Sequence, residues 1–190
     1  DYNILVDKAN VWTTYAVDVE AVHAFVSGRV AGTQMQRDGK MRNGLAADNS
    51  YGKSGKAHFL DGGFKVGANM DLGRGNTLGL GLGYEVRTPT PSTAFASPEI
   101  NNDFVANLHN EKVRSFELGY QLRTSWLAAS LSAYYSDITD GTEWQCFYFD
   151  APSTTTQSSF SYVSMTDVQK EYYGIEYGLN FKLSSAFNLK

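Results

Sequence analysis

A strict alternation of apolar and polar side chains between residues 110 and 138 limits the fold of this chain more than any other feature of the sequence. In the first half of this segment, one face of an extended chain carries Phe116, Leu118, Tyr120 and Leu122. After a break at Thr124-Ser125, the alternation resumes from Trp126 to Ile138. Successive residues of a β-strand point to opposite faces of a sheet. The segment therefore predicts two antiparallel strands joined by a very short turn, each with one apolar and one polar side.

The same period of two recurs along the chain and predicts further strands at residues 10–20, 22–35, 59–72, 76–87 and 172–183. Residues 1–9 have no clear pattern, and residues 187–190 look like the start of another strand. Very short links are expected near residues 20–21, 73–75 and 184–185. Long polar segments predict loops at residues 36–58, 88–111 and 139–171. The third of these loops has the pattern of a local hairpin between residues 143–149 and 159–163.

The predicted connections alternate between short and long along the whole chain. An antiparallel meander across a membrane has this arrangement, with short turns on the periplasmic side and long loops outside. A soluble sandwich has no reason to sort its loop lengths in this way. We therefore predict an all-β fold, an antiparallel up-and-down transmembrane β-barrel. A soluble β-sandwich or soluble barrel is the alternative.

Composition excludes several other classes of protein. No run approaches the roughly 20 consecutive apolar residues that a membrane-spanning helix needs. The net charge of −4 provides no basic face for a nucleic-acid partner. The single cysteine, Cys146, excludes an internal disulfide. No cofactor is expected.

The polar faces of the predicted strands combine glycines with charged side chains. A closed barrel of eight strands would need bulky side chains to fill its interior, whereas these faces suit a wide, wet lumen or one that holds a plug. The chain also has no signal peptide and ends within a strand, so we interpret it as a segment, about seven or eight strands, of a larger barrel. The lumen-facing polar residues are predicted to be Lys65, Glu85, Arg87, Glu117, Arg123, Glu176 and Lys182.

Several motifs resemble those of a known family. Residues 110–120, Asn-Glu-Lys-Val-Arg-Ser-Phe-Glu-Leu-Gly-Tyr, resemble the beginning of a barrel strand in TonB-dependent outer-membrane receptors. Residues 87–102, with Arg87-Thr88-Pro89 at their start, look like the external loop before it. Residues 170–176, Lys-Glu-Tyr-Tyr-Gly-Ile-Glu, resemble a later strand, and residues 42–50 look like a loop of the version common in Bacteroidetes. The order and spacing of these motifs cover most of residues 36–183.

The resemblance implies a barrel of about 22 strands around an N-terminal plug domain. It also implies energy supplied by the inner-membrane protein TonB through a short box near the N-terminus. The sequence shows neither a plug nor a TonB box, so residues 1–190 are interpreted as one partial barrel domain from the C-terminal half. The expected partners are outer-membrane lipid, the plug and remaining barrel of the same full-length protein, and TonB. A surface lipoprotein is a further candidate partner.

The expected function is part of a receptor that binds and imports a scarce nutrient (a siderophore, cobalamin, glycan or peptide) through the loops at residues 36–58, 88–111 and 139–171. The candidate substrate residues in these loops are Trp144, Tyr148, Arg42, Asp48 and Asn49. For the two aromatic residues, packing within a loop hairpin or in a membrane-surface girdle is the alternative to a platform for a sugar or chelate. The alternative function is a small, self-contained outer-membrane β-barrel with a structural or adhesive role.

No catalytic or metal-binding motif is evident in the sequence. Gly52-Lys53-Ser54 resembles the end of a phosphate-binding loop, but Ala47 stands where the first glycine is needed. No histidine is paired with a serine in the setting of a nucleophile, so an enzyme is not expected. No histidine and cysteine cluster has metal-ligand spacing. Tyr84, Tyr135 and Tyr173, at the outer ends of outward faces, are predicted to form an aromatic girdle.

Overall fold

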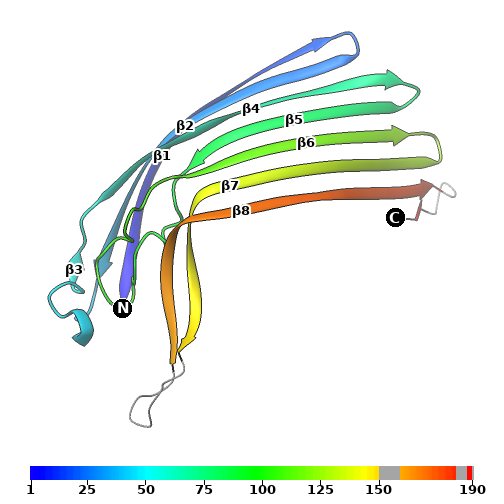
Figure 1. Cartoon of the computed structure of the whole chain (residues 1–190). Helices are drawn as coiled ribbons and strands as arrows, with labels where there is room; N and C mark the ends of the chain where they lie inside the picture. The colour runs from blue at the N-terminus through cyan, green and yellow to red at the C-terminus, as the bar shows by residue number, and fades with distance from the viewer. Residues whose placement is uncertain (150–158, 183–187, 190) are drawn as a thin grey trace.

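The computed structural model describes residues 1–149, 159–182 and 188–189, and these residues form one curved antiparallel sheet (Figure 1). The strand order is β1-β2-β4-β5-β6-β7-β8-β9, and β3 pairs with β2. The strands are β1 (Tyr2–Val19), β2 (Val22–Gly39), β3 (Gly52–Lys53), β4 (Ala57–Gly73), β5 (Asn76–Arg87), β6 (Glu111–Arg123), β7 (Leu127–Phe149), β8 (Ser159–Lys182) and β9 (Asn188–Leu189). A single 3-10 turn, η1 (Gly44–Ala46), lies between β2 and β3 in this part of the chain. Among the described helical segments, none has the length and apolar character to cross a membrane.

The connections are sorted by length to the two ends of the sheet (Figure 1). The short turns after β1, β4 and β6 lie at one end, and the long loops after β2 and β5 lie at the other. In the turn after β4, Arg74 and Gly75 both have positive φ, at 55° and 79°. This conformation matches the twist of a two-residue hairpin. A Cβ at Gly75 would lie 1.9 Å from the Arg123 carbonyl oxygen, so glycine is required there for close approach as well.

The predicted fold class is confirmed, and β5 has the predicted bounds. The prediction was wrong at several strand ends. Residues 1–9 belong almost entirely to β1, and residues 36–39 belong to β2, because Tyr2 to Ala9 pair in register with Gly32 to Gly39. Backbone pairing thus continues where the alternation of side chains has faded.

The third long segment is mostly strand, and the prediction of a loop at residues 139–171 was wrong. β7 and β8 continue beyond the other strands as a two-stranded hairpin that bends away from the sheet (Figure 1). The predicted local hairpin is confirmed, since Glu143 pairs with Met165 and Phe149 with Ser159. An irregularity of register between Ile138 and Glu143 accompanies the bend. The short turn predicted at residues 184–185 lies outside the described residues.

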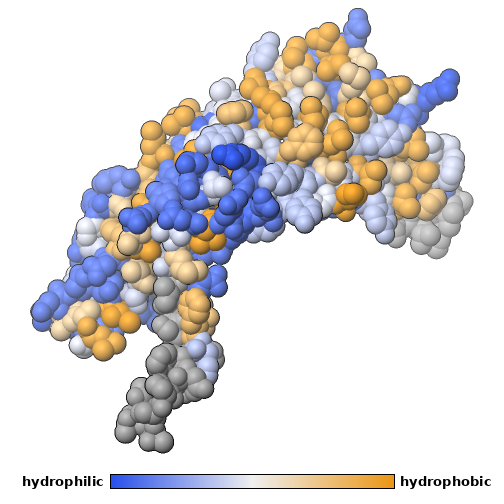
Figure 2. All heavy atoms as spheres, viewed as in Figure 1, coloured by the Kyte–Doolittle hydropathy of each residue, from blue (hydrophilic) through white to orange (hydrophobic). Residues whose placement is uncertain are grey.

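The sheet has an apolar face and a polar face that follow from the register. On the apolar face, large side chains are exposed rather than packed against a second layer. They include Val11, Tyr15, Val26, Leu78, Leu80, Leu82, Leu118, Leu131, Tyr173, Ile175 and Leu179. Figure 2 shows hydrophobic residues over the strands toward their short turns, and hydrophilic residues toward the loops. An exposed apolar surface of this extent is typical of one that contacts lipid or another protein.

The apolar face ends at an aromatic row. Phe116, Tyr135 and Tyr173 are direct cross-strand neighbours on β6, β7 and β8. The next row outward on this face is charged, and there Arg114 lies 3.4 Å from Asp137. Tyr84 lies beside Arg114, with its ring 6.1 Å from that of Phe64. An aromatic row followed by charges is the arrangement expected at a membrane surface, although the girdle itself stays a prediction.

The small hydrophobic core lies under a loop, on the polar face of the sheet. Met35, Ala94 and Phe95 are buried there, and Phe95 stacks on Phe104 with ring centroids 4.6 Å apart. The partly buried residues that pack against this core are Ile4, Phe59, Phe104 and Leu108. The segment between β5 and β6 therefore folds back over β1, β2 and β4 instead of projecting away from the sheet.

The assignment of the two faces can be tested with two adjacent residues of β6. In the full-length protein with Cys146→Ser, we expect Glu117→Cys to react with a small hydrophilic thiol reagent in outer-membrane preparations. Leu118→Cys should react at least about tenfold more slowly, because lipid surrounds its face. Labelling rates measured by mass spectrometry check this. Equal rates at the two positions would contradict the assignment.

Candidate functional site

An ionic network occupies the polar face near the loop end of the sheet. The Asp61 side chain on β4 is fully buried and lies 3.3 Å from Lys8 Nζ of β1 and 3.1 Å from Arg29 Nη2 of β2. Thr88, which follows β5, donates a hydrogen bond of 2.7 Å to the same carboxylate. Arg29 Nη2 also donates to Glu85 Oε1 at 2.7 Å. Charges of both signs thus compensate one another across four strands.

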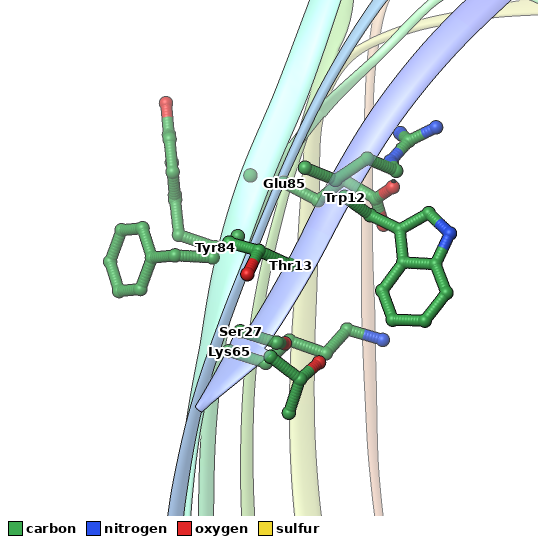
Figure 3. A pocket seen from close by; sticks show the side chains of 11 residues that line it. Trp12, Thr13, Ser27, Lys65, Tyr84 and Glu85 are labelled. Carbon is green, nitrogen blue, oxygen red and sulfur yellow. Dashed lines mark hydrogen bonds and ion pairs between the residues drawn. The ribbon is translucent and has the colours of Figure 1, made fainter. Parts of the chain in front are cut away.

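A depression next to this network offers an exposed aromatic side chain. On the polar face it is lined by Trp12, Ser27, Lys65 and Glu85, while Tyr84 lies on the opposite side of the sheet (Figure 3). The Trp12 side chain is 70% exposed, and Trp12 is the cross-strand partner of Arg29. An exposed indole beside paired charges can stack on a flat or sugar-like ligand while neighbouring polar groups bind its edges.

Arg37 of β2 holds two loops against the polar face. It is 1% exposed, and its Nε donates a hydrogen bond of 2.7 Å to the Pro98 carbonyl oxygen. Its Nη1 donates to the Ser50 carbonyl oxygen at 2.9 Å and also to the Asn102 side chain. The guanidinium lies 5.2 Å from the centre of the Tyr2 ring. One buried side chain therefore joins the β2–β4 loop to the β5–β6 loop.

The two loops are also bonded directly. The Asn49 side chain donates a hydrogen bond of 2.7 Å to Asp103, and the Asn49 carbonyl oxygen accepts one of 2.8 Å from the Asn102 backbone. Asn49 was predicted to contact substrate. It bridges the two loops and is exposed, and its role in substrate binding stays a prediction. Arg42 and Asp48 are exposed in the same loop, and their role in substrate binding stays a prediction.

The other predicted residues lie in two regions. Trp144 and Tyr148 belong to the β7–β8 hairpin, where Trp144 is half-buried and Tyr148 is 60% exposed. The hairpin contacts the β5–β6 loop through Ser164, which donates a hydrogen bond of 2.9 Å to the Thr93 carbonyl oxygen. Arg42 and Asp48 belong to the β2–β4 loop instead, so the predicted substrate residues come from two separate segments.

The predicted lumen residues share the polar face by register but do not form one cluster. Lys65 and Glu85 lie at the depression, and Arg87 Nε lies 2.7 Å from Glu111 Oε1 near the loops. The remaining four lie progressively nearer the short turns: Glu117, Glu176, Arg123 and Lys182. Their exposure to a lumen stays a prediction.

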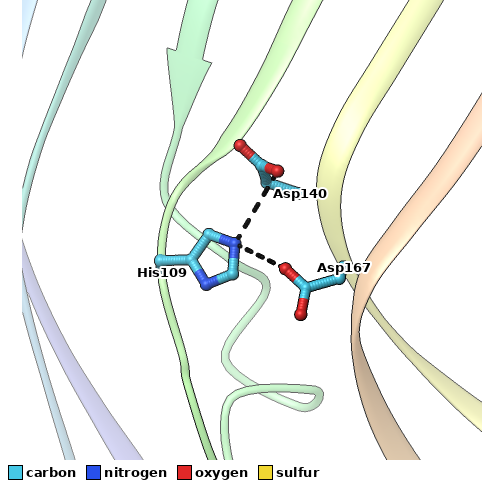
Figure 4. Close-up of side chains that lie close together, drawn as sticks. All are labelled: His109, Asp140 and Asp167. Atoms are coloured by element: carbon cyan, nitrogen blue, oxygen red, sulfur yellow. Dashed lines mark ion pairs between the residues drawn. The ribbon is translucent and has the colours of Figure 1, made fainter.

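A second cluster lies where the β7–β8 hairpin bends away (Figure 4). His109, just before β6, has its Nε2 3.3 Å from Asp167 Oδ1 and 4.0 Å from Asp140 Oδ1. Both aspartates have positive φ, at 59° and 61°, which is uncommon outside glycine. Lys112 Nζ donates a hydrogen bond of 2.6 Å to Asp140 Oδ2, and this bond lowers the pKa of the Asp140 carboxyl below its ordinary value.

The sequence interpretation missed most residues of these clusters. Lys8 lies in a segment without a clear pattern, and Arg37 lies in a segment taken for a loop. Asp61 and Arg29 could have been found, because the period of two places both on the polar faces of their strands. Asp61 is two positions from Gly63 and four from Lys65. His109, Asp140 and Asp167 carry no local signal, since only the fold brings them together.

Comparisons with known proteins agree with this architecture. A family model described as "TonB dependent receptor-like, beta-barrel" matches residues 64–190. A solved structure named "Copper transporter OprC" superposes with a TM-score of 0.74 and 18% sequence identity. The alignment covers 96% of this chain and 27% of that chain, so the present chain spans about a quarter of that protein's length. At this identity the likeness shows the fold alone. No curated protein sequence matches the chain.

The role of Arg37 can be tested by proteolysis of the full-length protein. Replacing Arg37 by Ala leaves buried carbonyl oxygens without a donor, a loss of roughly 1.5–3 kcal/mol for each charged hydrogen bond. We expect chymotrypsin to cleave near Leu45 and Tyr51 about tenfold faster or more, because the loop opens more often. Arg42→Ala, which removes an exposed cation from the same loop, is the control. Equal cleavage rates in the two variants would argue against an anchoring role.

Proposed function

The chain belongs to the TonB-dependent receptor β-barrel family, and we propose that it forms part of the wall and outer mouth of a receptor that binds a scarce nutrient and imports it. Membership in this family makes it a protein of the bacterial outer membrane. The observation that best supports the proposal is the sheet itself. Its apolar face is suited to lipid, and its polar face carries paired charges beneath two anchored loops.

A self-contained barrel fits the sheet less well. In a closed barrel of eight strands, the first strand would pair with the eighth. Here β1 and β8 lie toward opposite edges of the sheet, and β1 pairs only with β2 among the described strands. Backbone groups at a sheet edge cannot remain unpaired in lipid. We therefore propose that the remaining strands and the plug belong to the same full-length receptor, and that TonB supplies its energy.

The proposed substrate surface is the polar face at the loop end, centred on Trp12. Trp12 combines high exposure with neighbouring charged groups, and the anchored loops border the same face. A siderophore, cobalamin, a glycan or a peptide each offers flat or ring-shaped groups that an indole can stack on. Copper transport is part of the name of the structurally similar protein, and it does not identify the substrate of this chain. We also propose a surface lipoprotein as a partner of the full-length receptor.

The general proposal predicts a specific nutrient phenotype. Cells that lack the full-length gene should lose growth when one of four sources is limiting: a ferric siderophore, cyanocobalamin, an oligosaccharide or an oligopeptide. Loss of TonB should abolish the same uptake, because import against a gradient needs energy. Unchanged growth and uptake on all four sources in the deletion strain would overturn the proposal for these substrate classes.

The placement of the substrate surface has its own test. With the source found in that screen, we expect Trp12→Ala to raise the concentration for half-maximal uptake about fivefold or more, since stacking contributes about 0.5–1.5 kcal/mol beyond buried area. Tyr15→Ala is the matched control, because Tyr15 is an equally exposed aromatic residue on the other face of β1. Receptor abundance is measured by immunoblot. An equal shift in both variants would show that Trp12 has no specific contact.

A further inference from the structure

We propose that His109, Asp140 and Asp167 bind a divalent first-row transition-metal ion, with zinc as the ion of choice, at the outer end of the barrel wall. One imidazole nitrogen and two carboxylate oxygens from three chain segments all lie within 4.8 Å of one another (Figure 4). This donor set of nitrogen and oxygen suits zinc and its neighbours in the first transition row. The proposal does not depend on which nutrient the receptor imports.

The orientation of the imidazole favours a metal ligand. His109 Nδ1 is hydrogen-bonded to the backbone carbonyl oxygen of Asn107. A carbonyl oxygen only accepts, so Nδ1 carries the proton and donates it. In the neutral ring the lone pair is then on Nε2, the atom that faces both aspartates. Histidines that bind metals usually donate their other ring nitrogen to a backbone carbonyl or carboxylate in this way.

The oxygens of Asp140 are divided between two functions. Lys112 binds Oδ2 at 2.6 Å, while Oδ1 is the oxygen on the His109 side. The lysine therefore fixes the carboxylate and leaves Oδ1 for a metal ion. The two carboxylates outnumber the one lysine, which binds Asp140, and the nearby Arg114 is paired with Asp137, so the net charge here is negative and attracts a cation.

The spacing of the three ligand atoms is close to what coordination requires. Metal–ligand distances of about 2.1 Å in a tetrahedral site separate the ligand atoms by roughly 3.4 Å. The separation between His109 Nε2 and Asp167 Oδ1 is already 3.3 Å, and Asp140 Oδ1 lies 4.0 Å from the same nitrogen. A small rotation of the Asp140 side chain would bring all three ligand atoms to this spacing. Three protein ligands leave a position for water or for a donor atom of a bound molecule.

The site would connect the β5–β6 loop to both strands of the β7–β8 hairpin. His109 is close to the end of the loop, and Asp140 and Asp167 flank the pair Gly141 and Val168 at the bend. Thr166 donates a hydrogen bond to the Ala106 carbonyl oxygen nearby, so the loop is already held against the hairpin. A bound ion would fix the angle at which the hairpin leaves the sheet. The competing interpretation is an ion pair only, in which a protonated His109 is held by the same two aspartates.

Zinc binding by the purified full-length receptor in detergent distinguishes the two interpretations. Competition with a chromophoric chelator at neutral pH measures the number of zinc equivalents and their affinity. We expect His109→Ala and Asp167→Asn each to lose one equivalent or to bind it at least about tenfold more weakly. Visible absorption of added Co²⁺ should fall in the same two variants. Asp167 is exposed, so Asp167→Asn keeps the test valid if His109→Ala fails to fold.

His23→Ala is the matched control. His23 also pairs with an aspartate, Asp18 at 2.7 Å, but it has a single carboxylate partner and lies at the opposite end of the sheet. Unchanged binding in His23→Ala together with the loss in the other two variants supports the site. Equal zinc binding in wild type, His109→Ala and Asp167→Asn would overturn it, leaving an ion pair only. An equal loss in all three variants would also overturn it, because the binding would then be nonspecific.

Discussion

The pairing of backbone groups is the constraint from which the rest of this structure follows. In lipid, each unpaired N–H or C=O costs several kcal/mol, so a strand that crosses the membrane must bond to a neighbour along its full length. In the described sheet, β2, β4, β5, β6 and β7 each have a hydrogen-bonded partner on both sides. Because pairing fixes the register, every second side chain must then suit lipid, and every other one must suit water. The apolar face and the polar face therefore both follow from the same pattern of backbone pairing.

The same constraint explains why the outer loops are anchored on the polar face. The apolar face is reserved for lipid, so loop residues such as Phe95 can be buried only on the other side, against Met35 and its neighbours. Folding inward brings the carbonyl oxygens of Ser50 and Pro98 close to β2, where they need hydrogen-bond donors. A long side chain with several donors is needed to bond them, and Arg37 is that side chain. The β2–β4 and β5–β6 loops are consequently held in place before any ligand binds, which reduces the conformational entropy lost on binding.

The sequence predicted the structure well where lipid imposes a pattern and poorly elsewhere. β5 was predicted from Asn76 to Arg87 because each apolar residue there faces lipid in strict alternation. β1 was predicted to start too late, since residues such as Asp7 and Lys8 lie on different faces and are both polar. The parts of β7 at residues 139–142 and of β8 at residues 164–171 were missed for the same reason. The two charged clusters depend on cross-strand register, and no local period encodes the distance between His109 and Asp167.

The free edge of β1 sets a further condition on the complete receptor. β1 runs from Tyr2 to Val19, and its apolar face carries exposed Val11, Tyr15 and Val17. A strand with such a face lies in lipid, where its second edge also needs a hydrogen-bonding partner. We infer that another strand of the receptor pairs there, beyond those that the described residues provide. Trp12 would then stand within a continuous wall rather than at an edge. Under the proposed function, Trp12 then faces the lumen, although β1 is an edge strand of the described sheet.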